Sequence, residues 1–405
     1  MDRSANLWRS HSPANLGWVN SARPDTSNKY LIISCDTHLN EPVEIWTDRL
    51  SRDLVEQLPR VEVDSDGQKW MVAPGMSKVR LLFHEGEGEE EDKERVRAAR
   101  SCEQIIADMK RDGVDLQIAF PNKGLMLFAV AEILVMYSMA AAYNDWLAES
   151  FLPIRNRVLP MAVLPASDVD LSLKELDRIG RKGFFRGVLL PTRVTFGPHI
   201  TGSAGYNVGK FDPLWARLQD MNLTATFHTG TGFDNFAVRG PGSALINYAC
   251  WCGRAAMEPV SHLCSSGLLD RFPRLRFASV ECGIGYLPWL LGRLDEAYKK
   301  HYMWVRPKLS KLPSEYFFEQ GFASFEEDLS GVQTIDPRLG DDNYFQRLEN
   351  CYLWSNDYPH HEGTWPHSAA AIERQMLHLT EAQRKKILGE NAIRCFQLQD
   401  LFTHA

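Results

Sequence analysis

The sequence predicts a single (β/α)8 barrel, in which a closed parallel sheet is wrapped by helices. Short apolar and β-branched runs alternate with helical patterns through most of the 405 residues, as in parallel α/β folds. The runs are apolar throughout, so both faces of the sheet are expected to be buried. No Gly-x-Gly-x-x-Gly follows the first run, so the sequence does not indicate a doubly wound dinucleotide-binding sheet.

The strand pattern occurs eight times along the chain. The segments are residues 30–36, 115–120, 158–164, 187–191, 223–228, 275–281, 321–324 and 352–357. Helical spacing lies between them, at residues 94–111, 171–182, 287–300 and 381–401. The second of these helices ends at Gly183, a residue suited to a helix C-cap. Strand and helix therefore alternate as a barrel requires.

One apolar run, residues 125–143, is nearly long enough to cross a bilayer. It contains Glu132 and continues without a break into the polar residues Asn144 and Asp145. We therefore expect a buried amphipathic helix here and no membrane partner.

The chain is expected to form one barrel domain, residues 30–405, preceded by a polar arm, residues 1–29, rich in Ser, Asn and Pro. No linker divides the barrel. Long insertions follow the first strand, at residues 37–114, and surround the seventh, at residues 301–350. In a barrel these insertions would lie over one rim, where chemistry is normally built.

Composition narrows the partners and the compartment. The net charge is −7 and the pI is about 6.0, without a Lys/Arg cluster, which argues against nucleic acid or an anionic membrane surface. The eight cysteines form no CxxC pair, so we expect reduced, buried thiols. The N-terminal segment has no hydrophobic stretch typical of a signal peptide. The cytoplasm is the expected location.

Ionisable residues close four of the predicted strands. Asp36 and His38 end the first strand two positions apart, so they can point the same way. His228 ends the fifth strand and Glu281 the sixth, while Asp357 ends the eighth. Each alone has a structural explanation, such as a hydrogen-bonded core histidine or a turn-forming aspartate. Their common position on one rim predicts a site for a divalent ion.

The chain resembles the amidohydrolase-related branch of the amidohydrolase superfamily, which contains aminocarboxymuconate-semialdehyde decarboxylase. The resemblance covers roughly residues 30–400 and is most specific in the strand-six and strand-eight segments. The matching segments are CDTHLNEPVEIW (35–46), AYNDW (142–146), GVLLPTR (187–193), HTG (228–230), ECGIGYLPW (281–289) and SNDYPH (355–360).

The resemblance implies a (β/α)8 barrel with one catalytic metal ion, zinc or manganese, of which we favour zinc. By position, Asp36 and His38 would be first-strand ligands and His228 the fifth-strand ligand. Asp357 would be the eighth-strand ligand and would also transfer a proton. His360 is favoured over His361 as the histidine that faces the site. The resemblance also implies a homodimer or higher homo-oligomer.

Two departures from the family pattern affect the expected chemistry. Family decarboxylases often begin with His-x-His or Glu-x-His, where this chain has Asp36-x-His38. Many carry a histidine at the end of strand six, where this chain has Glu281. Glu281 could be a fifth ligand or could orient a water molecule, and Glu41 is a weaker ligand candidate.

The negative charge of the predicted site favours hydrolysis over decarboxylation, and hydrolysis is the main prediction. A metal-activated water would attack a carbonyl-type carbon, with Asp357 as general acid and base and Glu281 or His360 assisting. Three carboxylates beside one dication disfavour an anionic substrate at the metal. Kinship favours the alternative, a non-oxidative decarboxylase of a hydroxy-aromatic or muconate-type acid, in which Arg193 or Arg239 would offset the negative charge. A barrel that binds a small molecule without turnover is the second alternative.

The expected substrate is a small aromatic or ring-derived molecule. Aromatic side chains lie beside the predicted strand ends, among them Trp46, Phe233 and Tyr286. Such side chains suit a flat, apolar ligand. We predict that these three residues and Arg193 bind the substrate.

Overall fold

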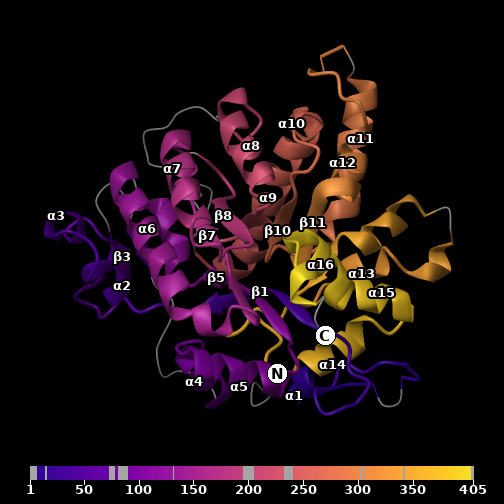
Figure 1. Ribbon diagram of the computed structural model, residues 1–405. Coiled ribbons are helices and arrows are strands. Elements are labelled where there is room, and N and C mark those ends of the chain that lie inside the picture. The colour runs from indigo at the N-terminus through magenta and orange to yellow at the C-terminus, as the bar shows by residue number, and fades with distance from the viewer. Residues whose placement is uncertain are drawn as a thin grey trace.

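The computed structural model describes residues 7–13, 16–72, 78–80, 90–130, 132–194, 205–231, 240–301, 303–304, 306–340 and 343–402. Its centre is a parallel sheet that follows the predicted strand order (Figure 1). The strands are β1 (Ile33–Leu39), β5 (Leu116–Pro121), β6 (Val158–Pro160), β7 (Ala162–Val163), β8 (Gly187–Pro191), β9 (Thr224–His228), β10 (Phe277–Val280), β11 (Gly321–Phe325) and β12 (Tyr352–Trp354). Every residue of these strands is buried.

Backbone hydrogen bonds close the sheet into a barrel. β6 and β7 are two parts of the predicted third strand, interrupted at Met161, whose N–H donates to Ala119 O of β5 at 2.8 Å. On the other side, the Asp357 N–H donates to Asp36 O at 3.0 Å and the His38 N–H to Tyr358 O at 2.6 Å. These bonds join the segment after β12 to β1. The predicted (β/α)8 barrel is therefore confirmed.

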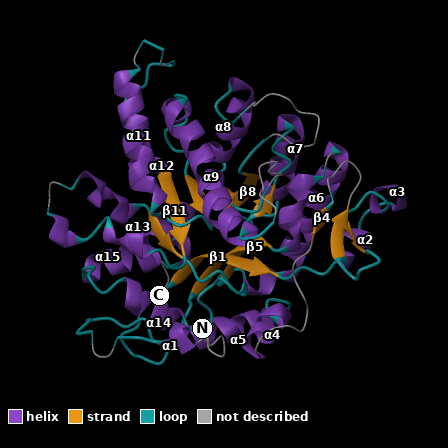
Figure 2. Cartoon of the chain, turned by 180° about the vertical axis from the view of Figure 1, so that it is seen from behind, coloured by secondary structure: helices purple, strands orange, loops and turns teal. Residues whose placement is uncertain are grey.

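Helices follow the strands and cover the outside of the sheet (Figures 1 and 2). They are α5 (Cys102–Asp112), α6 (Ile133–Ser150), α7 (Val169–Gly180), α8 (Asp212–Asp220), α9 (Ser243–Ser265), α10 (Leu268–Arg271), α11 (Tyr286–Lys300), α12 (Pro313–Gln320), α13 (Leu329–Gln333), α14 (Ser368–Gln375), α15 (Glu381–Lys385) and α16 (Asn391–Phe396). A π-helical turn, η6 (Lys386–Glu390), joins α15 to α16. No described helix is long and apolar enough to cross a membrane.

Two predicted helices are each divided in the structure. The segment 94–111 forms α4 (Glu90–Arg97) and α5, because the Ser101 hydroxyl caps the second helix by accepting from Gln104 N. Ala99, between the two helices, has a left-handed φ of 58°. The run 125–143 is likewise shared between a 3-10 turn, η1 (Lys123–Ala129), and α6.

The insertion after β1 contains structure of its own. Two short helices, α2 (Glu44–Thr47) and α3 (Arg52–Val55), precede an antiparallel sheet. Its strands are β2 (Arg60–Val63), β3 (Lys69–Val72) and β4 (Val79–Arg80). The insertion then returns through α4 to α5, which lies beneath the barrel in the view of Figure 1.

The described part of the N-terminal arm packs on the end of the chain. Its short helix α1 (Leu7–Ser10) lies beside α14 in both views (Figures 1 and 2). The Arg374 guanidinium of α14 donates to the carbonyl oxygens of Arg9 and His11 at 2.6 and 2.7 Å. Arg23 forms a two-pronged ion pair with Glu373. The arm is thus attached to the closing helices of the barrel.

Candidate metal centre

Five ionisable side chains from four segments of the chain meet at the carboxyl ends of the strands. Asp36 and His38 lie on β1, and His228 is the last residue of β9. Glu281 follows β10 directly, and Asp357 lies just beyond β12. All are buried except Glu281, whose side chain is 14% exposed. Because parallel strands end on one rim, residues distant in sequence come together here.

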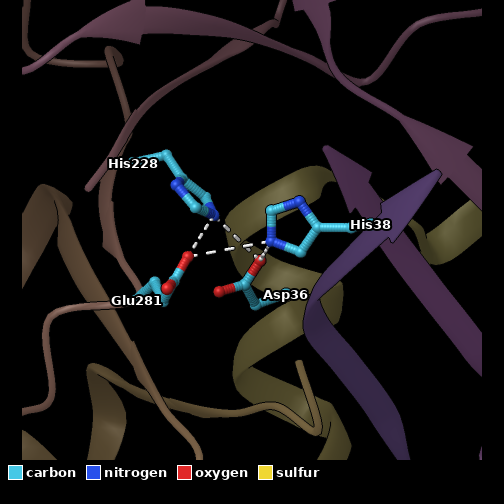
Figure 3. A group of neighbouring side chains, drawn as sticks. All are labelled: Asp36, His38, His228 and Glu281. Carbon is cyan, nitrogen blue, oxygen red and sulfur yellow. Dashed lines mark hydrogen bonds and ion pairs between the residues drawn. The ribbon is translucent and has the colours of Figure 1, made fainter. Parts of the chain in front are cut away.

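The inner group consists of Asp36, His38, His228 and Glu281 (Figure 3). The His228 Nε2 atom lies 2.9 Å from Glu281 Oε2 and 3.2 Å from Asp36 Oδ1. The His38 Nε2 atom lies 3.6 Å from Asp36 Oδ1 and 3.7 Å from Glu281 Oε2. One ligand atom from each residue is therefore within 4.8 Å of the other three.

The far ring nitrogens of both histidines are fixed by backbone carbonyls. His38 Nδ1 lies 2.9 Å from Pro121 O, and His228 Nδ1 lies 2.6 Å from Thr229 O. A carbonyl oxygen only accepts, so each Nδ1 carries the proton that it donates. Each Nε2 is left facing the carboxylates. This is the arrangement that orients histidine ligands in metal sites.

The outer group adds Asp357 and His360 to His38 and Glu281. Asp357 Oδ1 lies 3.3 Å from His38 Nε2 and 3.0 Å from His360 Nδ1. The rings of His38 and His360 stack with their centroids 3.9 Å apart. The neighbouring His361 points outward, with its side chain 63% exposed.

Two of the acids have unusual backbone conformations. Glu281 and Asp357 have left-handed φ values of 57° and 46°, which cost energy for residues other than glycine. Gly363 allows the tight return of the chain after Asp357, because a Cβ there would lie 2.3 Å from Asn356 O. Such strain is typical of functional sites that the surrounding structure holds in place.

A buried hydrogen-bond network holds the backbone next to Asp357 in place. The neighbouring Asn356 accepts from Ser34 Oγ at 2.8 Å and donates to Asp112 Oδ2 at 2.9 Å. Asp112, on α5, also accepts from the backbone N–H and the hydroxyl of Ser368. These bonds tie the end of the eighth strand to β1, α5 and α14.

The close approach of imidazoles and carboxylates in the inner group shifts the pKa values of its members. Burial lowers the pKa of His228, but Asp36 and Glu281 outweigh it and raise the pKa to about 10. Burial likewise opposes the charged forms of His38 and Glu281. Their close contacts nevertheless raise the pKa of His38 well above its usual value and lower that of Glu281. Burial raises the pKa of Asp36.

The donor set fits a divalent cation. Several buried atoms that face the centre have no hydrogen bond within the described structure: Asp36 Oδ2, His38 Nε2, both Asp357 carboxylate oxygens and His360 Nδ1. Buried polar atoms are normally satisfied, so a missing partner must be explained. Imidazole nitrogens and carboxylate oxygens are common ligands of zinc and manganese. A divalent cation among them would supply the missing partner.

Two other predicted site residues, Glu41 and Arg193, bind partners outside the inner and outer groups. The Glu41 carboxylate accepts from the backbone N–H groups of Asn122 and Gly124, so it fixes the loop after β5. Arg193, just beyond β8, pairs through both Nε and Nη2 with Glu258 of α9. Its charge is therefore already offset by a carboxylate.

The predicted aromatic residues have different environments. Trp46, on α2, is buried and donates from its indole nitrogen to Met139 O of α6 at 3.2 Å. Tyr286 begins α11, and burial raises the pKa of its hydroxyl. Phe233 and Arg239 lie outside the described residues.

Glu326 is a further carboxylate at this rim, and it is not among the residues predicted from the sequence. It follows β11 directly and accepts from Ser355 Oγ at 2.9 Å. Burial, followed by the nearby charges of Asp36, Asp357 and Glu281, raises its pKa well above the usual value. Its position after an apolar run was the signal that could have revealed it, since the same signal identified Glu281.

The family model described as amidohydrolase matches residues 33–398. Among characterised relatives, the gamma-resorcylate decarboxylase of Polaromonas sp. (strain JS666) is 25% identical over 295 residues, which are 72% of this chain and 85% of that protein. The gamma-resorcylate decarboxylase of Rhizobium sp. (strain MTP-10005) is 26% identical over 270 residues, or 64% of this chain and 76% of that protein.

Solved structures share the fold at lower identity. An amidohydrolase from Mycobacterium avium subsp. paratuberculosis has a TM-score of 0.70 at 18% identity, covering 91% of this chain and 98% of the other. A dihydroxybenzoic acid decarboxylase from Polaromonas sp., solved with bound manganese and the inhibitor 2-nitroresorcinol, has a TM-score of 0.62 at 20% identity. That alignment covers 91% of this chain and 97% of the other.

Proposed function

Because the chain belongs to the amidohydrolase family, we propose that it is a metal-dependent, non-oxidative decarboxylase of a hydroxylated aromatic acid. The observation that supports this proposal most strongly is the meeting of two histidines and three carboxylates at the barrel mouth. The decarboxylase activity of the relatives is the second support. These relatives favour decarboxylation, the alternative prediction from the sequence, over hydrolysis, the main one.

The residues that would hold the metal are Asp36, His38, His228 and Asp357, with Glu281 as a fifth donor 2.9 Å from His228. When bound, the ion would supply Lewis acidity to the carboxylate and adjacent hydroxyl of the substrate. Zinc is the ion that the sequence favours. We propose manganese, because three carboxylates and two imidazoles exceed the four ligands usual for zinc and suit a harder ion. Manganese is also the ion bound in the dihydroxybenzoic acid decarboxylase.

Asp357 is the proposed proton donor. Although burial opposes it, His360 lowers the pKa of Asp357, so this carboxylate would first take a proton from His360. That proton would then go to the ring carbon that bears the carboxylate, forming a carbon–hydrogen bond. The bond from that carbon to the carboxylate would then break, its electron pair would restore the aromatic ring, and carbon dioxide would leave. His360, 3.0 Å from Asp357 Oδ1 and with a side chain 22% exposed, would return a proton from solvent.

The negative charge of the site limits how the substrate can bind. Arg193 is already paired with Glu258, so it offers little net charge to a substrate carboxylate. Burial and the neighbouring carboxylates raise the pKa of Glu326, which favours its protonated form, a hydrogen-bond donor that adds no fourth negative charge. A phenolic substrate, which needs donors and acceptors beside an apolar ring, suits these surroundings.

Product analysis with manganese-loaded protein tests the proposal against hydrolysis. We would offer 2,6-dihydroxybenzoate and other hydroxybenzoates in parallel with aromatic amides and lactones. Equal amounts of carbon dioxide and the corresponding phenol are expected from a hydroxybenzoate. Cleavage of an amide or lactone, with no carbon dioxide from any acid, would instead support the hydrolase, in which Glu281 would orient the attacking water.

A further inference from the structure

Two arginines from outside the barrel hold the loop that carries the outer half of the site. This strand-eight loop, residues 357–367, leads from Asp357 through His360 to α14. Backbone bonds to β1 hold only its first two residues, Asp357 and Tyr358, and no strand ladder fixes residues 359–367. Yet the contacts of His360 with His38 and Asp357 require a well-defined backbone position.

The first arginine, Arg95, comes from the insertion after β1. It lies on α4 and its side chain is 3% exposed. Its guanidinium donates to His360 O at 2.5 Å and to Trp365 O. Glu91, on the same helix, accepts from Arg95 at 3.1 Å and contacts His367 Nε2 at 3.1 Å. Both ends of the loop are thereby attached to α4.

The second arginine, Arg9, comes from the N-terminal arm, outside the residues that the family model matches. It lies on α1, which packs on α14. Its guanidinium donates to Gly363 O and, at 2.6 Å, to His361 O. Together the two arginines bind four carbonyl oxygens within six consecutive residues of the loop.

We propose that Arg9 and Arg95 are positioning residues that set the place of His360 against the metal centre. Charged hydrogen bonds from a planar guanidinium are strong and directional, so two of them define a backbone position. The bound carbonyls include that of His360 and that of the residue after it. The N-terminal arm thus becomes part of the catalytic apparatus. The inference rests on the proposed function only in taking Asp357 and His360 as the proton-transfer pair.

The test compares Arg9→Gln with Arg23→Gln in the full-length, manganese-loaded protein. Both variants remove one arm arginine, but Arg23 pairs with Glu373 and Ser12 and, among the described residues, makes no hydrogen bond with the loop. Hydrogen–deuterium exchange of peptides that cover residues 358–367 reports the loop. Manganese affinity reports the centre without any substrate.

In Arg9→Gln we expect loop exchange to rise about tenfold and kcat to fall about tenfold with KM little changed, while manganese affinity falls by less than kcat. Arg23→Gln should match the wild type in all of these. Unchanged loop exchange in Arg9→Gln, or raised exchange with unchanged manganese affinity and kcat, would overturn the inference. If the wild type releases no carbon dioxide from any acid, the proposed function fails, and the exchange and affinity results still decide whether the arm positions the loop.

Discussion

The two sides of the metal centre are built in different ways. The strand side consists of Asp36, His38 and His228, which lie within β1 and β9. The parallel ladder of the barrel sets their positions, and backbone carbonyls orient both imidazoles. The loop side consists of Asp357 and His360, which lie beyond the last residue of β12. Side chains from α5, α4 and the N-terminal arm hold this segment.

The two sides suit two different tasks, metal binding and proton transfer. A metal site needs ligands at fixed distances, which a strand ladder provides. Proton transfer needs a group that contacts both the substrate and solvent, and a loop at the rim can supply it. We therefore expect substitutions on the strand side to abolish metal binding, and those on the loop side to reduce the chemical step more than metal binding.

The largest effect is expected for His228→Ala. Removing this imidazole deletes one ligand and leaves the carboxylates of Asp36 and Glu281 without their nearest imidazole. Stoichiometric metal binding should be lost, as measured by elemental mass spectrometry. His378→Ala is the control, because His378 is a half-buried histidine that contacts Val332 O. Full metal content in His228→Ala would exclude His228 as a ligand.

Asp357→Asn should separate metal binding from chemistry. The amide cannot give a carboxyl proton, so kcat should fall by about 10²- to 10⁴-fold. Asp36, His38, His228 and Glu281 remain to hold the ion, so at least half of the wild-type metal content should persist. The measurement combines kcat with metal content on the same sample. Near-normal kcat in this variant would rule out Asp357 as the proton donor.

Metal affinity should rise with pH. In the metal-free protein the pKa of His228 is about 10 and that of His38 is also raised, so both rings are protonated at neutral pH. Metal binding must displace these protons. Below the histidine pKa values, each displaced proton therefore weakens binding about tenfold per unit decrease in pH. Calorimetry in buffers of different ionisation enthalpy would count the released protons, and a count of zero at pH 7 would contradict this charge state.

The smallest effect is expected for Asp112→Asn. The amide would present hydrogens to donors from Asn356 and Ser368, which should lower the free energy of unfolding by about 1–3 kcal/mol. Because Asn356 precedes Asp357, kcat should also fall about tenfold. Glu175→Gln is the control, since Glu175 is equally buried but binds Asn144 and Arg178. Equal kcat in the two variants would assign Asp112 a role in stability alone.

The sequence predicted the strand side better than the loop side. Apolar runs revealed all eight strands, and a polar residue at the end of a run is visible without a structure, as Asp36, His38 and His228 illustrate. The eighth strand was predicted to reach Asp357, but it ends at Trp354, because the left-handed backbone of Asp357 cannot continue a strand.

The contacts that hold the loop could not be read from the sequence. Arg9 and Gly363 are 354 residues apart, and no local pattern indicates that an arginine of the N-terminal arm binds the strand-eight loop. Asp112 follows the predicted helix 94–111 without any local sign of burial, yet it is buried because α5 packs against the segment after β12. Such long-range polar contacts depend on the complete tertiary structure.

The most direct test of the metal centre is anomalous diffraction from crystals of the manganese-loaded protein. We predict one strong peak per chain at about 2.0–2.3 Å from a carboxylate oxygen of Asp36 and from the Nε2 atoms of His38 and His228. Asp357 or Glu281 should complete the coordination. A peak away from these side chains, or none at full manganese loading, would contradict metal binding at this rim and with it the proposed decarboxylase.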